Sequence, residues 1–169
     1  MRDSMEKKVS GKRPGPALAD GEELLHCVVD IIDEVELSGG QSPAYIMAIT
    51  TDRLIFFHRG GKGFAGVMSS IFSGKWEARA SRAMSGQDLS HLLEGDPDPR
   101  TYLREDIRSI DVDRGKRLAS GLEITVGKRR PDLFSFPKRY FDDVLRVLEK
   151  HYSGLVHQTT GLLAMGQQT

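Results

Sequence analysis

The side chains that most often carry catalysis are scattered in this sequence. Its five histidines include no pair spaced three or four residues apart, the spacing that places two side chains on one helix face. His91, Glu94 and Asp96 form the densest group of metal-binding residue types, but they span a predicted helix end, where acidic side chains are usually solvated. Cys27, the single cysteine, lies among alternating apolar residues and is interpreted as a buried small hydrophobic side chain. We therefore predict no catalytic residues, no metal site and no enzyme activity.

A glycine-rich segment at residues 61–66, GKGFAG, has the G-x-G-x-x-G spacing of dinucleotide-binding loops. Such a loop belongs to a β-α-β unit with a parallel sheet. Here the strand before the segment closes a predicted hairpin, and the residues after it are rich in alanine and serine. We interpret the match as chance and predict no cofactor.

An apolar stripe overlaps the same segment and repeats at i, i+3, i+4, i+7 and i+8, which is typical of one face of a helix. Its members are Phe64, Val67, Met68, Ile71 and Phe72. Lys62 and Lys75 flank the stripe, and no acidic residue occurs between Arg53 and Lys75. An apolar face between basic flanks suits a partner protein or an anionic membrane surface. The other interpretation is that the stripe packs into the core, as most amphipathic helices of small domains do.

Two basic clusters form a candidate anion-binding site: Lys116 with Arg117, and Lys128 with Arg129 and Arg130. Arginine guanidinium groups match the geometry of phosphate oxygens. The clusters flank one predicted strand and would lie about 20 Å apart at ~3.3 Å per residue, so they need not form one site. Solvated loop charge is the other interpretation. No aromatic residue interleaves the clusters and the chain balances 24 basic against 24 acidic residues, so we expect no nucleic-acid partner.

The remaining pattern predicts short strands interrupted by one helical region and followed by one helix. Alternating or continuous apolar runs predict strands at residues 25–31, 44–50, 53–58, 101–103, 107–113, 122–126 and 133–136. Thr51-Asp52 suits a hairpin turn, and the uneven spacing from Ile107 to Ile110 suggests a bulge. Residues 76–84 favour a helix, and Ser85 with Asp88 has the spacing of a capping box for a second one. The 3.6-residue period of residues 139–152 predicts a terminal amphipathic helix, with Phe141 and Leu145 buried.

Short antiparallel strands need a closed or covered sheet to remove their edges. The predicted fold is therefore mainly β with α: an antiparallel β-barrel of about seven strands, with a helical insertion in the middle and a C-terminal helix as a cap. A flexible segment at residues 1–20 precedes a domain at residues 21–152, with its insertion at about residues 60–100. Residues 153–169 are expected to form a loose tail.

Two of these segments resemble the bacterial PH-like and GRAM-like domains. Residues 48–56, AITTDRLIF, are similar to the family's hairpin of the form hydrophobic-Thr-x-x-Arg-Leu-hydrophobic-Phe. Residues 102–110, YLREDIRSI, are similar to its polar-Asp-Ile-x-x-Ile strand, and a final strand and helix follow. The resemblance implies a PH-like fold over about residues 21–152. Members of the family bind phosphoinositides or proteins, so the resemblance implies binding without naming the ligand.

The sequence thus predicts a non-enzymatic interaction module that binds a protein partner or an anionic membrane surface. The alternative is a small ligand-binding protein or enzyme that uses a pocket at the barrel mouth. The polar N-terminus has no signal-peptide core and no apolar run is long enough to span a bilayer. We expect a cytoplasmic protein, with peripheral contact to a membrane as the variant that the apolar stripe suggests.

Overall fold

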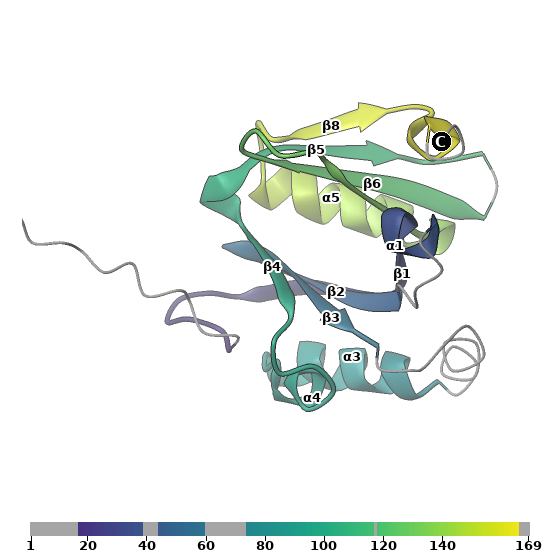
Figure 1. Ribbon diagram of the computed structural model, residues 1–169. Coiled ribbons are helices and arrows are strands. Elements are labelled where there is room, and N and C mark those ends of the chain that lie inside the picture. The colour runs from purple at the N-terminus through teal and green to yellow at the C-terminus, as the bar shows by residue number, and fades with distance from the viewer. Residues whose placement is uncertain (1–16, 39–43, 60–73, 117, 166–169) are drawn as a thin grey trace, which may run out of the picture.

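The computed structural model describes residues 17–38, 44–59, 74–116 and 118–165 of the 169-residue chain (Figure 1). It is an α+β protein with a single mixed sheet of eight strands. The strands are β1 (Leu24–Asp33), β2 (Ala44–Thr50), β3 (Arg53–His58), β4 (Arg100–Leu103), β5 (Ile107–Asp113), β6 (Ala119–Val126), β7 (Asp132–Pro137) and β8 (Val156–Thr159). The helices are α1 (Glu34–Ser38), α3 (Lys75–Gly86), α4 (Ser90–Leu93), α5 (Phe141–His151) and α6 (Leu162–Met165), with 3-10 turns η1 (Arg104–Asp106) and η2 (Lys138–Tyr140).

The sheet has the strand order β4-β3-β2-β1-β7-β6-β5-β8. All neighbours are antiparallel except β5 and β8, which run parallel. The sheet is not closed into a barrel, and among the described residues β4 and β8 form its two edges. The α+β class and the seven predicted strands are confirmed, whereas the closed, purely antiparallel barrel is corrected to an open, mixed sheet. Each edge strand has only four residues and so exposes few unpaired backbone groups, which lets the sheet remain open.

The segment after Ser153 is not a loose tail, and that prediction was wrong for the described residues. β8 pairs with β5 from Val156 opposite Ile110 to Thr159 opposite Asp113. The buried carboxylate of Asp113 then accepts a hydrogen bond of 2.9 Å from the backbone of Leu162, at the start of α6. The segment after Ser153 is therefore held in place by the pairing of β8 with β5 and by the hydrogen bond from Leu162 to Asp113.

The β2–β3 hairpin forms where it was predicted because one hydroxyl organises its turn. Thr50 Oγ1 accepts hydrogen bonds from the backbone of Asp52 and Arg53, at 3.2 and 3.0 Å. It donates to the Glu22 carboxylate at 2.6 Å, which ties the hairpin to the residues before β1. The predicted irregularity near Ile107 is also present, as a register shift between Ile107 and Ser109 in the β5–β6 pairing.

Two apolar clusters lie on opposite faces of the β1–β3 region. The larger cluster joins both halves of the sheet to α5, and it includes Met47, Phe56, Phe134 and Val144. The smaller cluster lies between the other face of β1–β3 and the α3–α4 layer, which Figure 1 shows beneath the strands. β2 and most of β3 are therefore buried on both faces, which explains why their sequences are continuous apolar runs without alternation.

The two predicted helical regions are confirmed with corrections. The terminal helix is α5, and it buries Phe141, Val144 and Leu148, whereas Leu145 is only partly buried, contrary to the prediction. α3 covers the predicted 76–84 helix, but the capping box was wrong. Ser85 lies inside α3 and donates to the Ser81 carbonyl, while Asp88 accepts the backbone N–H of Ser90 at the start of α4.

A buried ion pair joins the chain before β1 to the start of β3. Arg53 Nε donates to Glu22 Oε1 at 2.8 Å, and both side chains are at most 2% exposed. Burial raises the pKa of Glu22, but the hydrogen bonds from Arg53, Ala19 and Thr50 outweigh it, and the net pKa is lowered. A carboxyl with a lowered folded-state pKa contributes stability above its unfolded pKa of about 4.3, and that contribution is lost as the pH falls through the folded value.

We expect the stability difference between the wild type and Glu22→Gln to be largest at pH 7 and to shrink as the pH falls below about 4, where the wild-type carboxyl becomes protonated. Urea unfolding at pH 7 and pH 3 measures both differences. An equal difference at the two pH values would contradict the ionised, hydrogen-bonded state of Glu22.

Candidate functional site

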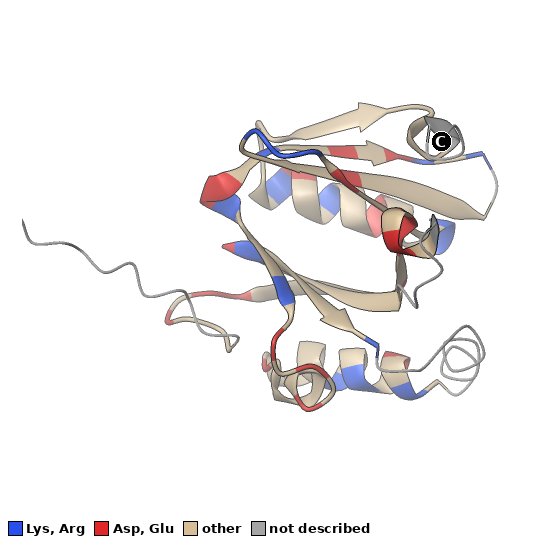
Figure 2. Cartoon of the chain, viewed as in Figure 1, with Lys and Arg blue, Asp and Glu red and all other residues tan. Residues whose placement is uncertain are grey.

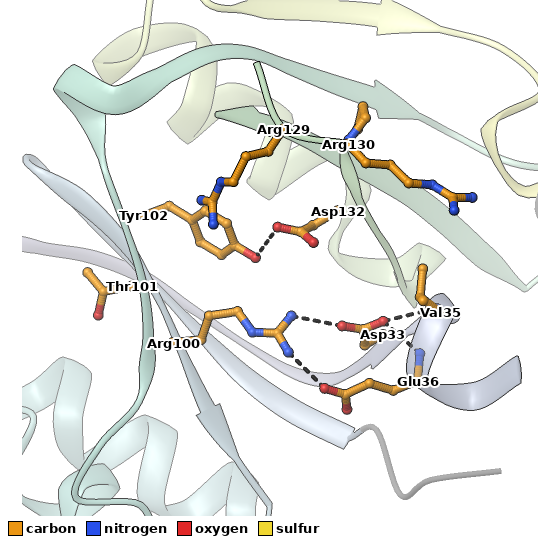
Figure 3. A pocket seen from close by; sticks show the side chains of 10 residues that line it. Asp33, Val35, Glu36, Arg100, Thr101, Tyr102, Arg129, Arg130 and Asp132 are labelled. Carbon is orange, nitrogen blue, oxygen red and sulfur yellow. Dashed lines mark hydrogen bonds and ion pairs between the residues drawn. The ribbon is translucent and has the colours of Figure 1, made fainter. Parts of the chain in front are cut away.

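A pocket of about 480 Å³ opens between the start of β4, the turn that joins β6 to β7, and α1 (Figure 3). We call it the Arg129 pocket. Its lining residues are Asp33, Val35, Glu36, Arg100, Thr101, Tyr102, Arg129, Arg130, Pro131 and Asp132. The pocket therefore combines residues from three segments that are far apart in the sequence. Three of the lining residues are arginines and three are acids.

The wall of the pocket beside α1 is an internally paired charge network centred on Arg100. Its guanidinium donates to Asp33 and to Glu36, both at 2.8 Å, and to the Tyr45 hydroxyl at 3.1 Å. Asp33 can hold this position because its other carboxylate oxygen caps α1, accepting the backbone N–H groups of Val35 and Glu36 at 2.9 and 3.0 Å. The bonds from Arg100 to Asp33 and Glu36 thereby fix the start of α1 to β4.

Tyr45 completes this network as a hydrogen-bond donor. Its hydroxyl donates to both oxygens of Glu36, at 2.9 and 3.0 Å. Burial and the bond to Glu36 raise the pKa of Tyr45, so the hydroxyl keeps its proton at neutral pH. The carboxylates of Asp33 and Glu36 and the guanidinium of Arg100 are thus bonded to one another. This wall of the pocket therefore has little capacity to bind a charged ligand.

The floor of the pocket is formed by Tyr102 and Asp132. The Tyr102 hydroxyl donates to Asp132 at 2.8 Å. Burial and the neighbouring Asp132 charge raise the pKa of Tyr102, so it also remains a neutral donor. Its ring lies in the main core, 5.4 Å from the ring of Phe56, which fixes the position of the hydroxyl.

Arg129 and Arg130 lie at the rim, in the exposed turn between β6 and β7. Neither guanidinium has an ion-pair or hydrogen-bond partner among the described residues. In Figure 3 the Arg129 side chain extends toward Tyr102, while that of Arg130 extends toward the side of α1. These are the charged groups of the pocket that remain available to a ligand.

The predicted anion-binding residues therefore separate into two places. Lys128, Arg129 and Arg130 share one turn, whereas Lys116 precedes β6 at its opposite end. The interpretation that the clusters need not form one site agrees with this placement. Arg117 lies outside the described residues.

The apolar stripe predicted to contact a membrane or a partner also lies outside the described residues, from Lys62 to Phe72. Its basic flank Lys75 is the first residue of α3 and is exposed. The two interpretations of the stripe, core or binding surface, both remain predictions.

The residue types that could support catalysis do not converge in the described part of the chain. No three histidine, cysteine, aspartate or glutamate side chains there are placed to hold a metal ion. Burial raises the pKa of the Cys27 thiol to about 12, so it is protonated at neutral pH. Burial lowers the pKa of His26, whose Nε2 is enclosed without a hydrogen-bond partner.

A second pocket, of about 660 Å³, opens beside the Glu22–Arg53 pair and is also lined by Asp52, Arg104 and Glu105. Its innermost charges, Glu22 and Arg53, are bonded to each other. This pocket is therefore a weaker candidate for ligand binding than the Arg129 pocket.

Sequence reasoning missed Arg100, Asp33, Glu36 and Tyr102 as neighbours. One signal was available: Asp33 followed three residues later by Glu36 has the spacing of a helix cap with its N3 acid. The pairing with Arg100 had no local signal, because 67 residues separate it from Asp33.

No helix of the described residues is long and apolar enough to cross a membrane. A scan against protein-family models and a search of the curated proteins both found no match to this chain.

Proposed function

We propose that this protein is a non-enzymatic interaction module of PH-like fold that binds an acidic, extended segment of a partner protein in the Arg129 pocket. The PH-like part rests on seven successive strands followed by α5, and on the resemblance of the β2–β3 hairpin and the β5 strand to that family. The open sheet is the feature in which this chain differs from the barrel that the resemblance implies.

One observation carries the proposal: Arg129 and Arg130 are exposed, border a pocket and have no partner for their guanidinium groups among the described residues. The third arginine of the pocket, Arg100, is neutralised by Asp33 and Glu36. A carboxylate or phosphate at the rim would therefore meet two guanidinium forks that lose no existing ion pair on binding.

The free edge of β4 favours an extended peptide over a small anion. The hydrogen bond from the Arg104 N–H to the Asp52 carbonyl, 2.9 Å long, fixes which β4 residues bond to β3. Bonding direction alternates along an antiparallel strand, so the backbone groups of Thr101 and Leu103 point away from β3. A peptide strand can add at such an edge, and Thr101 lines the same pocket as Arg129.

The non-enzymatic part of the proposal rests on the pairing of the buried polar groups. Glu22 is bonded to Arg53, Asp30 to Arg59, and Arg100 to two carboxylates. Groups used in this way stabilise the fold and are not poised for proton transfer. The alternative, a small-molecule pocket, differs in predicting no involvement of the β4 backbone.

We expect the double substitution Arg129→Ala/Arg130→Ala to weaken binding of a labelled hexaglutamate peptide by about tenfold, because two charge-assisted contacts are lost. Fluorescence anisotropy at low salt measures the dissociation constant, with hexalysine as the control peptide. Lys116→Ala, at the other end of β6, is the matched control and should leave the constant unchanged.

Amide chemical shifts during the same titration locate the peptide. Shifts at Thr101 and Leu103 support addition to the β4 edge. Shifts confined to the β6–β7 turn would instead favour a small anion site. Equal affinity of the wild type and the double variant would reject the Arg129 pocket as the binding site.

A further inference from the structure

The turn between β5 and β6 presents an apolar side chain to solvent. Leu118 is 88% exposed, compared with 57% for Val35 and 45% for Leu37, the other exposed large apolar side chains of the described residues. We call Arg114, Gly115, Lys116 and Leu118 the β5–β6 tip. It lies at the opposite end of β6 from the Arg129 pocket, about 25 Å away at ~3.3 Å per residue.

The backbone of the β5–β6 tip is held in place, so the exposure of Leu118 is built into the fold. The Leu118 carbonyl accepts the backbone N–H of Lys138 at 2.9 Å. Gly115 has a φ of +70°, and a Cβ there would lie 2.0 Å from the Ala119 carbonyl oxygen, so the turn requires glycine. The Gly115 carbonyl also accepts a 3.0 Å hydrogen bond from Lys138 Nζ.

Basic residues surround Leu118. Lys116 and Arg114 are exposed on the β5–β6 tip itself, and Lys138 lies beside it in η2. The guanidinium of the next residue, Arg139, lies instead 3.8 Å from Asp30 of β1. Figure 2 shows blue, basic segments just after the end of β5 and just before the start of α5. Of the nearby acids, Asp142 is paired with Arg114 at 2.6 Å, and Asp113 is buried. The local charge is therefore positive although the whole chain is neutral.

We propose that the β5–β6 tip binds the surface of an anionic lipid bilayer, with Leu118 inserted at the interface and Lys116 and Lys138 against the headgroups. A bilayer is the occupant that fits, because one apolar side chain on a narrow turn offers far less than the ~1,000 Å² of a stable protein interface. Interfacial insertion needs only a small apolar contact reinforced by basic residues.

This contact is independent of the proposed peptide site. A protein held at the membrane by the β5–β6 tip would keep the Arg129 pocket, at the other end of β6, free for a partner.

Flotation of the full chain with lipid vesicles tests the proposal. The wild type should bind vesicles of phosphatidylcholine with 30% phosphatidylserine at low salt, and not vesicles of phosphatidylcholine alone. Leu118→Ser should weaken the partition coefficient by about tenfold. Lys116→Glu should weaken it by about tenfold or more, since it reverses one charge and each basic residue contributes about fivefold.

Leu118 and Lys116 are exposed, so both variants should keep the wild-type melting temperature. Leu37→Ser makes the same chemical change at another exposed leucine, in α1, and is the matched control; it should bind vesicles like the wild type. No binding by the wild type to anionic vesicles would overturn the proposal. Wild-type binding by Leu118→Ser would also overturn it, since adsorption would then be electrostatic alone. Hexaglutamate binding should be unchanged in Leu118→Ser, which separates this test from that of the peptide site.

Discussion

Replacing Arg53 with methionine is expected to lower the free energy of unfolding by about 3–5 kcal/mol. Arg53 is 2% exposed and donates to both oxygens of Glu22, at 2.8 and 3.0 Å, and to the Ala17 carbonyl at 2.6 Å. Methionine fills much of the same volume but leaves the Glu22 carboxylate buried without its counter-charge. The free energy of unfolding in urea measures the loss.

Two further variants identify the cause of that loss. Glu22→Gln/Arg53→Met removes both charges and should be less destabilised than the sum of the single variants, since no unpaired charge is left in the interior. Arg108→Met removes an exposed arginine and should change stability by less than about 1 kcal/mol. Additive single losses would contradict a coupled buried pair.

Leu148→Ala is expected to lower the free energy of unfolding by about 2–5 kcal/mol. Leu148 is fully buried and belongs to the cluster that joins α5 to both halves of the sheet. Leu145→Ala is the matched control, because it makes the same chemical change in the same helix at a partly buried position, and its loss should be smaller. Urea unfolding of both variants gives the comparison, and equal losses would mean that α5 docks on a different face.

The parts of the fold that could be predicted are those with a local cause. The β2–β3 hairpin was found because a two-residue polar turn separates two apolar runs, and α5 because its apolar residues repeat every three or four positions. β8 was missed because it has only four residues, two of which, His157 and Gln158, are exposed. Such a short segment shows no alternation of apolar and polar residues. Its position depends on β5, which lies more than forty residues earlier.

The candidate site was predictable only in its turn residues. Arg129 and Arg130 stand out in the sequence because a basic run follows a strand. The partners that decide their role do not stand out, since Arg100 is an isolated arginine until the fold brings it to Asp33. Asp30 is a similar case. Its backbone is left-handed, with a φ of 62°, and its carboxylate pairs with Arg59. The alternation of apolar and polar residues along β1 does not indicate this local change of backbone direction.

The burial of the β1–β3 region on both faces bears on how a domain of this architecture can change its length. The face that packs against α3 and α4 consists of Leu24, Cys27, Val29, Ile46, Ala48, Ile55 and Phe57. A shorter domain with a tight loop between β3 and β4 would present all of these side chains to water, and such a patch leads to aggregation. The α3–α4 layer is therefore not a removable addition to the sheet. Gaining or losing it requires that face of the sheet to exchange apolar for polar residues in the same evolutionary step.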